Sequence, residues 1–175
     1  MNRIGDIIGI VSLGALAFQD FRSHRISWWL LPVAATGLLL GTAGKISFTE
    51  IGRSFLVNMF FLGVQFVLLW SWFFLRNRKR TKLIDRQIGL GDILFVICPA
   101  LAFSPVNFLV YYNVSLVLTL TGVLLFRMFR STEKLLIPLA GALALSLIVL
   151  CCWRLIDARV NFYSDEWLLL FAESC

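Results

Sequence analysis

The stretch Gly89-Leu90-Gly91-Asp92 stands where a strongly basic segment, residues 76–86, gives way to an apolar one, residues 93–103. An aspartate at the edge of an apolar segment costs free energy unless another group offsets the charge, so this one is a candidate functional residue. The two glycines allow the backbone to turn tightly and to approach a substrate or another helix closely. A short glycine–acid pattern is weak evidence for a functional site by itself. Its significance depends on whether the chain supplies a second carboxylate at the same depth in the membrane.

The composition surrounding this stretch is that of a membrane protein. The 175 residues are 59% hydrophobic and 15% charged, with 6 Trp and 16 Phe, and a single soluble domain of this length has too little interior to bury so much apolar surface. The net charge of +6 does not indicate a nucleic-acid partner, because the basic residues cluster between apolar segments. Such clusters are typical of cytoplasmic loops that face anionic lipid.

Six apolar segments predict an all-α, polytopic membrane protein with six transmembrane helices. The run of residues 92–126 is too long for one crossing of a hydrocarbon core about 30 Å thick, and Ser104-Pro105 is a natural break. The first segment faintly resembles a signal peptide, but an uncleaved helix is the better interpretation, because cleavage would remove Asp20. The expected segments are residues 4–19, 27–41, 51–75, 92–103, 105–126 and 135–153, followed by an interfacial tail, residues 154–175.

The distribution of basic residues predicts the orientation. Most of the 16 Lys and Arg residues fall in segments 22–25, 76–86 and 127–134, which the positive-inside rule places in the cytoplasm. Both termini are then outside. Asp20 ends the first helix and Asp92 begins the fourth, so the two share the cytoplasmic face, whereas acids such as Asp6 fall on the outer side.

Two carboxylates at the same depth in the membrane, those of Asp20 and Asp92, predict acid–base chemistry. Two like charges held close cannot both ionise easily, so one stays protonated. The ionised carboxylate can take a proton from water while the protonated one donates to a substrate carbonyl, as aspartyl peptide hydrolysis requires. The alternative is that Asp20 and Asp92 only cap helices or pair with arginines.

These residues resemble the type IV prepilin peptidase family and the related preflagellin peptidases. The resemblance rests on Asp20 followed by Ile26, on the Gly-x-Gly-Asp at 89–92, and on Lys134-Leu-Leu-Ile-Pro138 before the last span. It implies a membrane peptidase domain over residues 1–153 whose catalytic pair is Asp20 and Asp92. Gly89, Gly91, Ile26, Lys134 and Pro138 would be motif or positioning residues.

The family resemblance also implies a substrate and a location. Members are inner-membrane enzymes that cut a basic leader from prepilin-like, membrane-anchored precursors at the cytoplasmic border, with no metal or other cofactor. This chain departs from the family where Ser27-Trp28 follows Ile26 in place of Pro-Asn, and where Leu94 replaces a common lysine. The segment with paired CxxC motifs that is associated with N-methylation is absent, so proteolysis without methyl transfer is expected.

The runner-up function is a non-catalytic membrane transporter or assembly scaffold that uses the acids for proton or partner contacts. Gly122 and Gly141 are expected to allow close helix packing. Cys151 and Cys152 are interpreted as small residues of a membrane helix, with a disulfide to Cys175 as the alternative.

Overall fold

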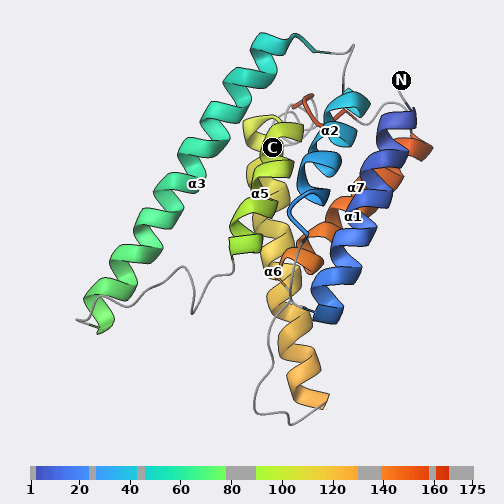
Figure 1. The fold of residues 1–175 in the computed structure, drawn as a ribbon. Helices are drawn as coiled ribbons and strands as arrows, with labels where there is room; N and C mark the ends of the chain where they lie inside the picture. The colour runs from blue at the N-terminus through green and yellow to red at the C-terminus, as the bar shows by residue number, and fades with distance from the viewer. Residues whose placement is uncertain are drawn as a thin grey trace, which may run out of the picture.

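The computed structural model describes residues 3–23, 27–42, 46–77, 90–129, 139–157 and 161–165. This part of the chain forms an all-helical bundle of six helices, as predicted from the apolar segments (Figure 1). The helices are α1 (Arg3–Ser23), α2 (Leu30–Thr42), α3 (Phe48–Asn77), α5 (Leu90–Ala102), α6 (Pro105–Phe129) and α7 (Leu139–Ile156).

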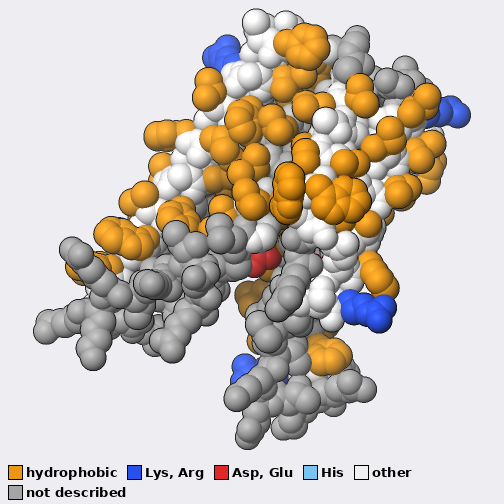
Figure 2. All heavy atoms as spheres, viewed as in Figure 1, with side chains coloured by type: hydrophobic (Ala, Val, Ile, Leu, Met, Phe, Trp, Pro, Cys, Tyr) orange, Lys and Arg blue, Asp and Glu red, His pale blue; other side chains and the backbone are white. Residues whose placement is uncertain are grey.

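Four of the described helices are long and apolar enough to cross a membrane. They are α1, α7, residues 48–72 of α3 and residues 105–128 of α6. The helices α2 and α5 are equally apolar but have only 13 residues each, or about 20 Å of helix. Large apolar side chains cover the visible face of the bundle, as expected for a surface in contact with lipid (Figure 2).

Paired glycines bring α1 and α2 into close, antiparallel contact. A Cβ on Gly5 would lie 2.5 Å from the backbone nitrogen of Gly41, and one on Gly37 would lie 2.6 Å from that of Gly9. Each helix therefore carries two glycines four residues apart, the small-xxx-small pattern that lets membrane helices approach until their backbones touch.

A tight turn between α5 and α6 confirms the predicted break. Pro105 occupies the first position of α6, where a missing N–H costs nothing. Ser104 caps the helix, because its Oγ accepts a hydrogen bond of 3.3 Å from the backbone N–H of Asn107. Two antiparallel helices therefore replace the single long helix that the apolar run alone would allow.

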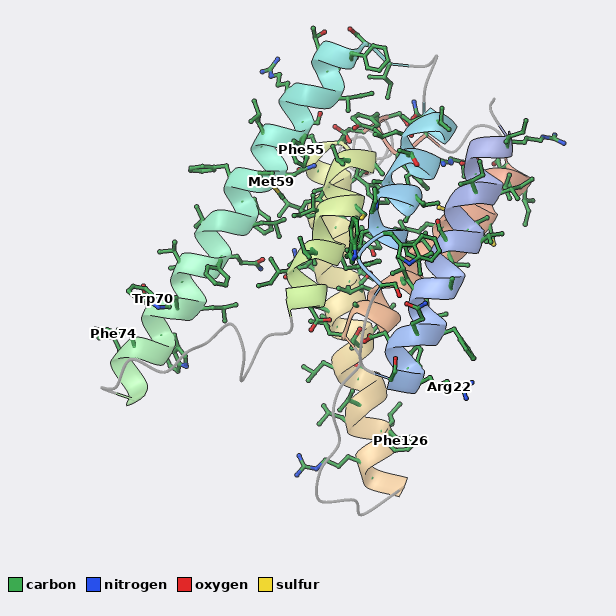
Figure 3. All side chains as sticks on the ribbon, viewed as in Figure 1. Arg22, Phe55, Met59, Trp70, Phe74 and Phe126 are labelled. Atoms are coloured by element: carbon green, nitrogen blue, oxygen red, sulfur yellow. The ribbon has the colours of Figure 1, made fainter. Side chains whose placement is uncertain are left out.

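One buried polar residue attaches α3 to α5. Asn58 donates hydrogen bonds from Nδ2 to the carbonyl oxygens of Ala100, at 2.9 Å, and of Phe103, at 3.1 Å, near the carboxyl end of α5. Phe55 and Met59 extend from the same part of α3 toward the bundle, whereas Trp70 and Phe74 lie where α3 has diverged from it (Figure 3). The two halves of α3 therefore differ in their contacts: the first packs on α5, and the second carries mostly exposed apolar side chains.

Residues 161–165 fold back over one end of the bundle, which we call the capped end. The ring of Phe162 lies 4.6 Å from that of Phe103, centroid to centroid, and its carbonyl oxygen accepts a hydrogen bond from the N–H of Ser104. Tyr163 donates from its hydroxyl to the carbonyl of Leu101 at 2.7 Å, and burial raises the pKa of Tyr163 to about 12, which keeps the phenol protonated. The apolar stretch 167–171, expected on the membrane surface, lies outside the described residues.

Candidate active site

Asp20 lies in the last turn of α1, at the end of the bundle opposite the capped end. Its side chain is only 5% exposed, and Oδ2 accepts a hydrogen bond of 2.6 Å from the backbone N–H of Gly141 in α7. Arg22 stands nearby in sequence, but its guanidinium lies 5.9 Å from the centroid of the Phe18 ring, at the exposed end of α1 (Figure 3). Asp20 is thus directed into the bundle, toward α7.

Asp92 reaches the same place from a different helix. It lies in the first turn of α5, is half-buried, and its Oδ1 accepts a hydrogen bond of 3.0 Å from the backbone N–H of Ala140. Acidic side-chain atoms are visible at this end of the apolar face (Figure 2). We call this the carboxylate end of the bundle.

The first turn of α7 therefore joins the two aspartates. Ala140 and Gly141 are neighbours, so the two accepting oxygens lie no more than about 9 Å apart, given the spacing of consecutive backbone nitrogens. The first N–H groups of a helix have no partner within the helix, and they carry its positive dipole end. Asp20 and Asp92, which are distant in sequence, satisfy two of these groups in α7.

Gly141 allows α1 and α7 to approach closely at this point. A Cβ at this position would lie 3.0 Å from Cε2 of Phe21 and 3.1 Å from Oδ2 of Asp20. The predicted role of Gly141 in close helix packing is therefore confirmed. For Gly122 the same prediction is wrong, because a Cβ there would have no neighbour within 4 Å; this glycine lies on the exposed surface of α6.

The other predicted site residues are only partly described. Gly91 is half-buried in the first turn of α5, next to Asp92. Gly89, Ile26, Lys134 and Pro138 lie outside the described residues, and their predicted roles stay predictions. Cys151 and Cys152 are free thiols in α7, and Cys175, their alternative disulfide partner, also lies outside the described part.

Two features of the structure were missed from the sequence. The amides of Ala140 and Gly141 were missed because a backbone donor has no side-chain signature. The second feature is an ion pair between Asp6 of α1 and Arg154 of α7, whose side chains are 0% and 2% exposed. A signal for this pair existed, since both residues were predicted on the outer side and an ionised group within a membrane segment needs a partner.

Comparison of this chain with protein-family models, with curated proteins and with solved structures finds no match. Among the described residues, no cluster of three or more His, Cys, Asp or Glu side chains is arranged to hold a metal ion. Inference about function therefore rests on the geometry around Asp20 and Asp92 and on the sequence motifs that contain them.

Proposed function

We propose that this protein is a membrane aspartyl endopeptidase that removes the leader peptide from prepilin-like, membrane-anchored precursors. The observation that carries the proposal is the meeting of Asp20 and Asp92 at adjacent amides of α7. A helix start has up to four unpartnered N–H groups, but a side chain in the residues just before the helix commonly caps them. Two carboxylates delivered there by two other helices favour a pair that acts together.

The reaction needs a water molecule between the carboxylates. The ionised aspartate takes a proton from this water, whose oxygen forms a bond to the carbonyl carbon of the scissile peptide. The protonated aspartate donates its proton to the carbonyl oxygen. Collapse of the tetrahedral intermediate breaks the C–N bond, and the proton taken from water passes to the leaving amine. One hydroxyl proton of the intermediate returns to the aspartate that had donated its proton, which restores the starting pair. The α7 amides hold both carboxylates in place, so positioning is supplied before substrate binds.

The proposed topology has six crossings, with α2 and α5 as the two short ones. Asp6 and Arg154 place the start of α1 and the end of α7 at the capped end, opposite Asp20 and Asp92. Together with the basic segments, this supports both termini outside and the carboxylate end at the cytoplasmic side of the inner membrane. A basic leader emerging on that side would reach the pair at the membrane border.

Substitution of the two aspartates tests the proposal. The purified protein in detergent is incubated with a synthetic precursor that carries a basic leader, a glycine at the expected cut and an apolar helix, and the products are identified by mass. Asp20→Asn and Asp92→Asn should each lower the cleavage rate about 100-fold or more, because each removes one proton-transfer group.

Glu50→Gln is the matched control, since this exposed acid begins α3 far from the site, and its rate should equal that of the wild type. Unchanged cleavage in both aspartate variants would refute the proposal and leave transport or scaffolding as the better account.

A further inference from the structure

The ion pair between Asp6 and Arg154 lies inside the bundle near its capped end. The Nη2 of Arg154 contacts Oδ1 of Asp6, and Nη1 donates a hydrogen bond of 3.4 Å to Oγ1 of Thr42 in α2. The guanidinium also lies over the Phe162 ring, 4.3 Å from its centroid. A Cβ on Gly41 would collide with both charged groups, so the pair fills the space that this glycine leaves.

Stability alone is a weak explanation for this pair. Asp6 Oδ2 and Arg154 Nε are buried without a hydrogen-bond partner among the described residues, so the two charges are incompletely compensated. A buried ion pair often contributes no more stability than apolar side chains of similar volume. What a directional polar contact supplies better than an apolar one is a single alignment of two helices.

The same two helices meet again at the carboxylate end. From Asp6 to Asp20 α1 rises about 21 Å, and from Gly141 to Arg154 α7 rises about 20 Å. The two contacts therefore match in an antiparallel alignment, one near each end of the helix pair. A slip of one turn would move Asp20 about 5.4 Å along α7 and break its hydrogen bond of 2.6 Å to Gly141.

Between these two contacts the facing surfaces have little to fix the alignment. Ser12 is the one polar side chain buried on α1 between Asp6 and Asp20, and its hydroxyl bonds to Ile8 and Gly9 of its own helix. The other buried residues there are apolar or small, and such contacts are non-directional and tolerate repacking. They are Leu13, Leu16 and Ala17 on α1, and Leu143, Ala144, Leu147 and Cys151 on α7, whereas Gly9 of α1 packs against α2.

We propose that Asp6 and Arg154 are positioning residues that set the register of α1 against α7 and thereby place Asp20 at the amide of Gly141. The register is a property of the fold, whereas its effect on catalysis rests on the proposed peptidase function. The pair acts from about 20 Å away, through the two rigid helices.

The test removes the pair without leaving a lone buried charge. The double variant Asp6→Leu/Arg154→Met replaces both buried charges by apolar side chains and should fold, with heat stability close to that of the wild type. We expect its kcat to fall at least 10-fold while KM stays within about twofold, because substrate contacts are retained and Asp20 is misplaced. A second variant, Asp6→Arg/Arg154→Asp, restores a pair of opposite charges and should recover part of the lost kcat.

Register is measured independently of cleavage. Spin labels are attached at two exposed positions, Phe18→Cys on α1 and the native Cys152 on α7. Cys175 is replaced by alanine, and Cys98 and Cys151 are buried and are therefore not labelled. These sites are offset along the helices, so a one-turn slip changes the distance between labels by about 5 Å. Ser115→Ala/Ser146→Ala, which removes a 2.8 Å contact between α6 and α7, is the matched control and should leave distance and kcat unchanged.

The outcomes separate the two proposals. A shifted or broadened label distance together with lower kcat in Asp6→Leu/Arg154→Met supports the positioning role. An unchanged distance overturns it, whatever the rate. A shifted distance with unchanged kcat keeps the register role but overturns the catalytic assignment of Asp20. If the wild type cleaves no precursor, the peptidase proposal fails, and the distance measurement still decides whether this pair sets the register.

Discussion

Gly141 is the residue at which helix packing and the proposed chemistry meet. In Gly141→Ala the new methyl group must displace the Phe21 ring or the Asp20 carboxylate, which lie 3.0 and 3.1 Å from its position. A displacement of 1 Å in a catalytic group can lower a rate about 100-fold, and the shift needed here is a few tenths of an ångström, so we expect kcat to fall about 3- to 10-fold. Stability should change by less than about 2 kcal/mol, since only a few tenths of an ångström must be absorbed.

The control for this prediction is Gly122→Ala on α6, where the added methyl group meets nothing within 4 Å. That variant should cleave at the wild-type rate, and it should be slightly more stable, by up to about 1 kcal/mol, because alanine restricts the unfolded chain. Equal rates in both glycine variants would show that the approach of Asp20 to α7 does not matter for the reaction. Rates are compared in detergent with thermal unfolding of the same samples.

For individual residues, the sequence predicts the two aspartates of the candidate site better than the groups to which they bind. Asp20 and Asp92 can be selected because a carboxylate at the edge of an apolar segment is conspicuous, and the predicted topology puts them on one face. Their binding to Gly141 and Ala140 could not be predicted, because it depends on how α7 is rotated and where its first turn lies. Those quantities are set by packing among several helices.

The helices were largely predictable from the lengths of the apolar segments and from the residues typical of turns between them. The break at Ser104-Pro105 was placed correctly because proline and a capping serine act locally. The second apolar segment is predicted to begin at Ser27, but α2 begins at Leu30, because residues 27–29 form a turn closed by a hydrogen bond of 3.0 Å from the N–H of Leu30 to the carbonyl of Ser27. The two tryptophans in that turn are apolar, so hydropathy alone cannot separate them from the helix.

The contact between α1 and α2 depends on glycines that the apolar pattern does not single out. Gly37→Ala would put a methyl group 2.6 Å from the backbone nitrogen of Gly9, and no side-chain rotation relieves a collision with backbone. We expect the two helices to separate, with a loss of about 1–3 kcal/mol, as for other overpacked sites. Thermal unfolding in detergent, followed by circular dichroism, measures the change.

Gly14→Ala is the matched control within α1, because a methyl group there meets nothing within 4 Å. It should leave the unfolding temperature unchanged or raise it slightly. If Gly37→Ala and Gly14→Ala unfolded alike, close backbone contact between α1 and α2 would not be what holds this part of the bundle together.

The whole molecule combines helices of unequal length, and the difference falls at the carboxylate end. The helix α5 has 13 residues and α6 has 25, so α6 is about 18 Å longer. The two are joined at the capped end by Phe103 and Ser104, so the excess of α6 projects beyond α5 at the other end (Figure 1). Asp92, in the first turn of α5, therefore lies well short of the end of α6.

The projecting part of α6 is mostly apolar, with the exposed Arg127 in its last turn. Leu124, Leu125, Phe126 and Met128 are all exposed there, which indicates lipid on that side. A hydrocarbon core about 30 Å thick exceeds the roughly 20 Å of α2 or α5, so in the proposed six-crossing topology the bilayer beside these short helices must thin for water and the proposed substrate to reach Asp92. In that topology the aspartates are recessed relative to the lipid surface around α6.

This recess predicts that membrane thickness controls the rate. The purified protein is reconstituted in phosphatidylcholines with monounsaturated chains of increasing length, and cleavage of a precursor is followed in each. We expect the fastest cleavage in the thinnest bilayers and a fall of about 10-fold across the series, because mismatch costs fractions of a kcal/mol per ångström. Protein extracted back into detergent from every vesicle type should show one common rate, which excludes damage during reconstitution. A rate that stayed flat or rose with thickness would mean that α2 and α5 do not thin the bilayer around Asp92, and that water and substrate reach the site by a route independent of the surrounding lipid.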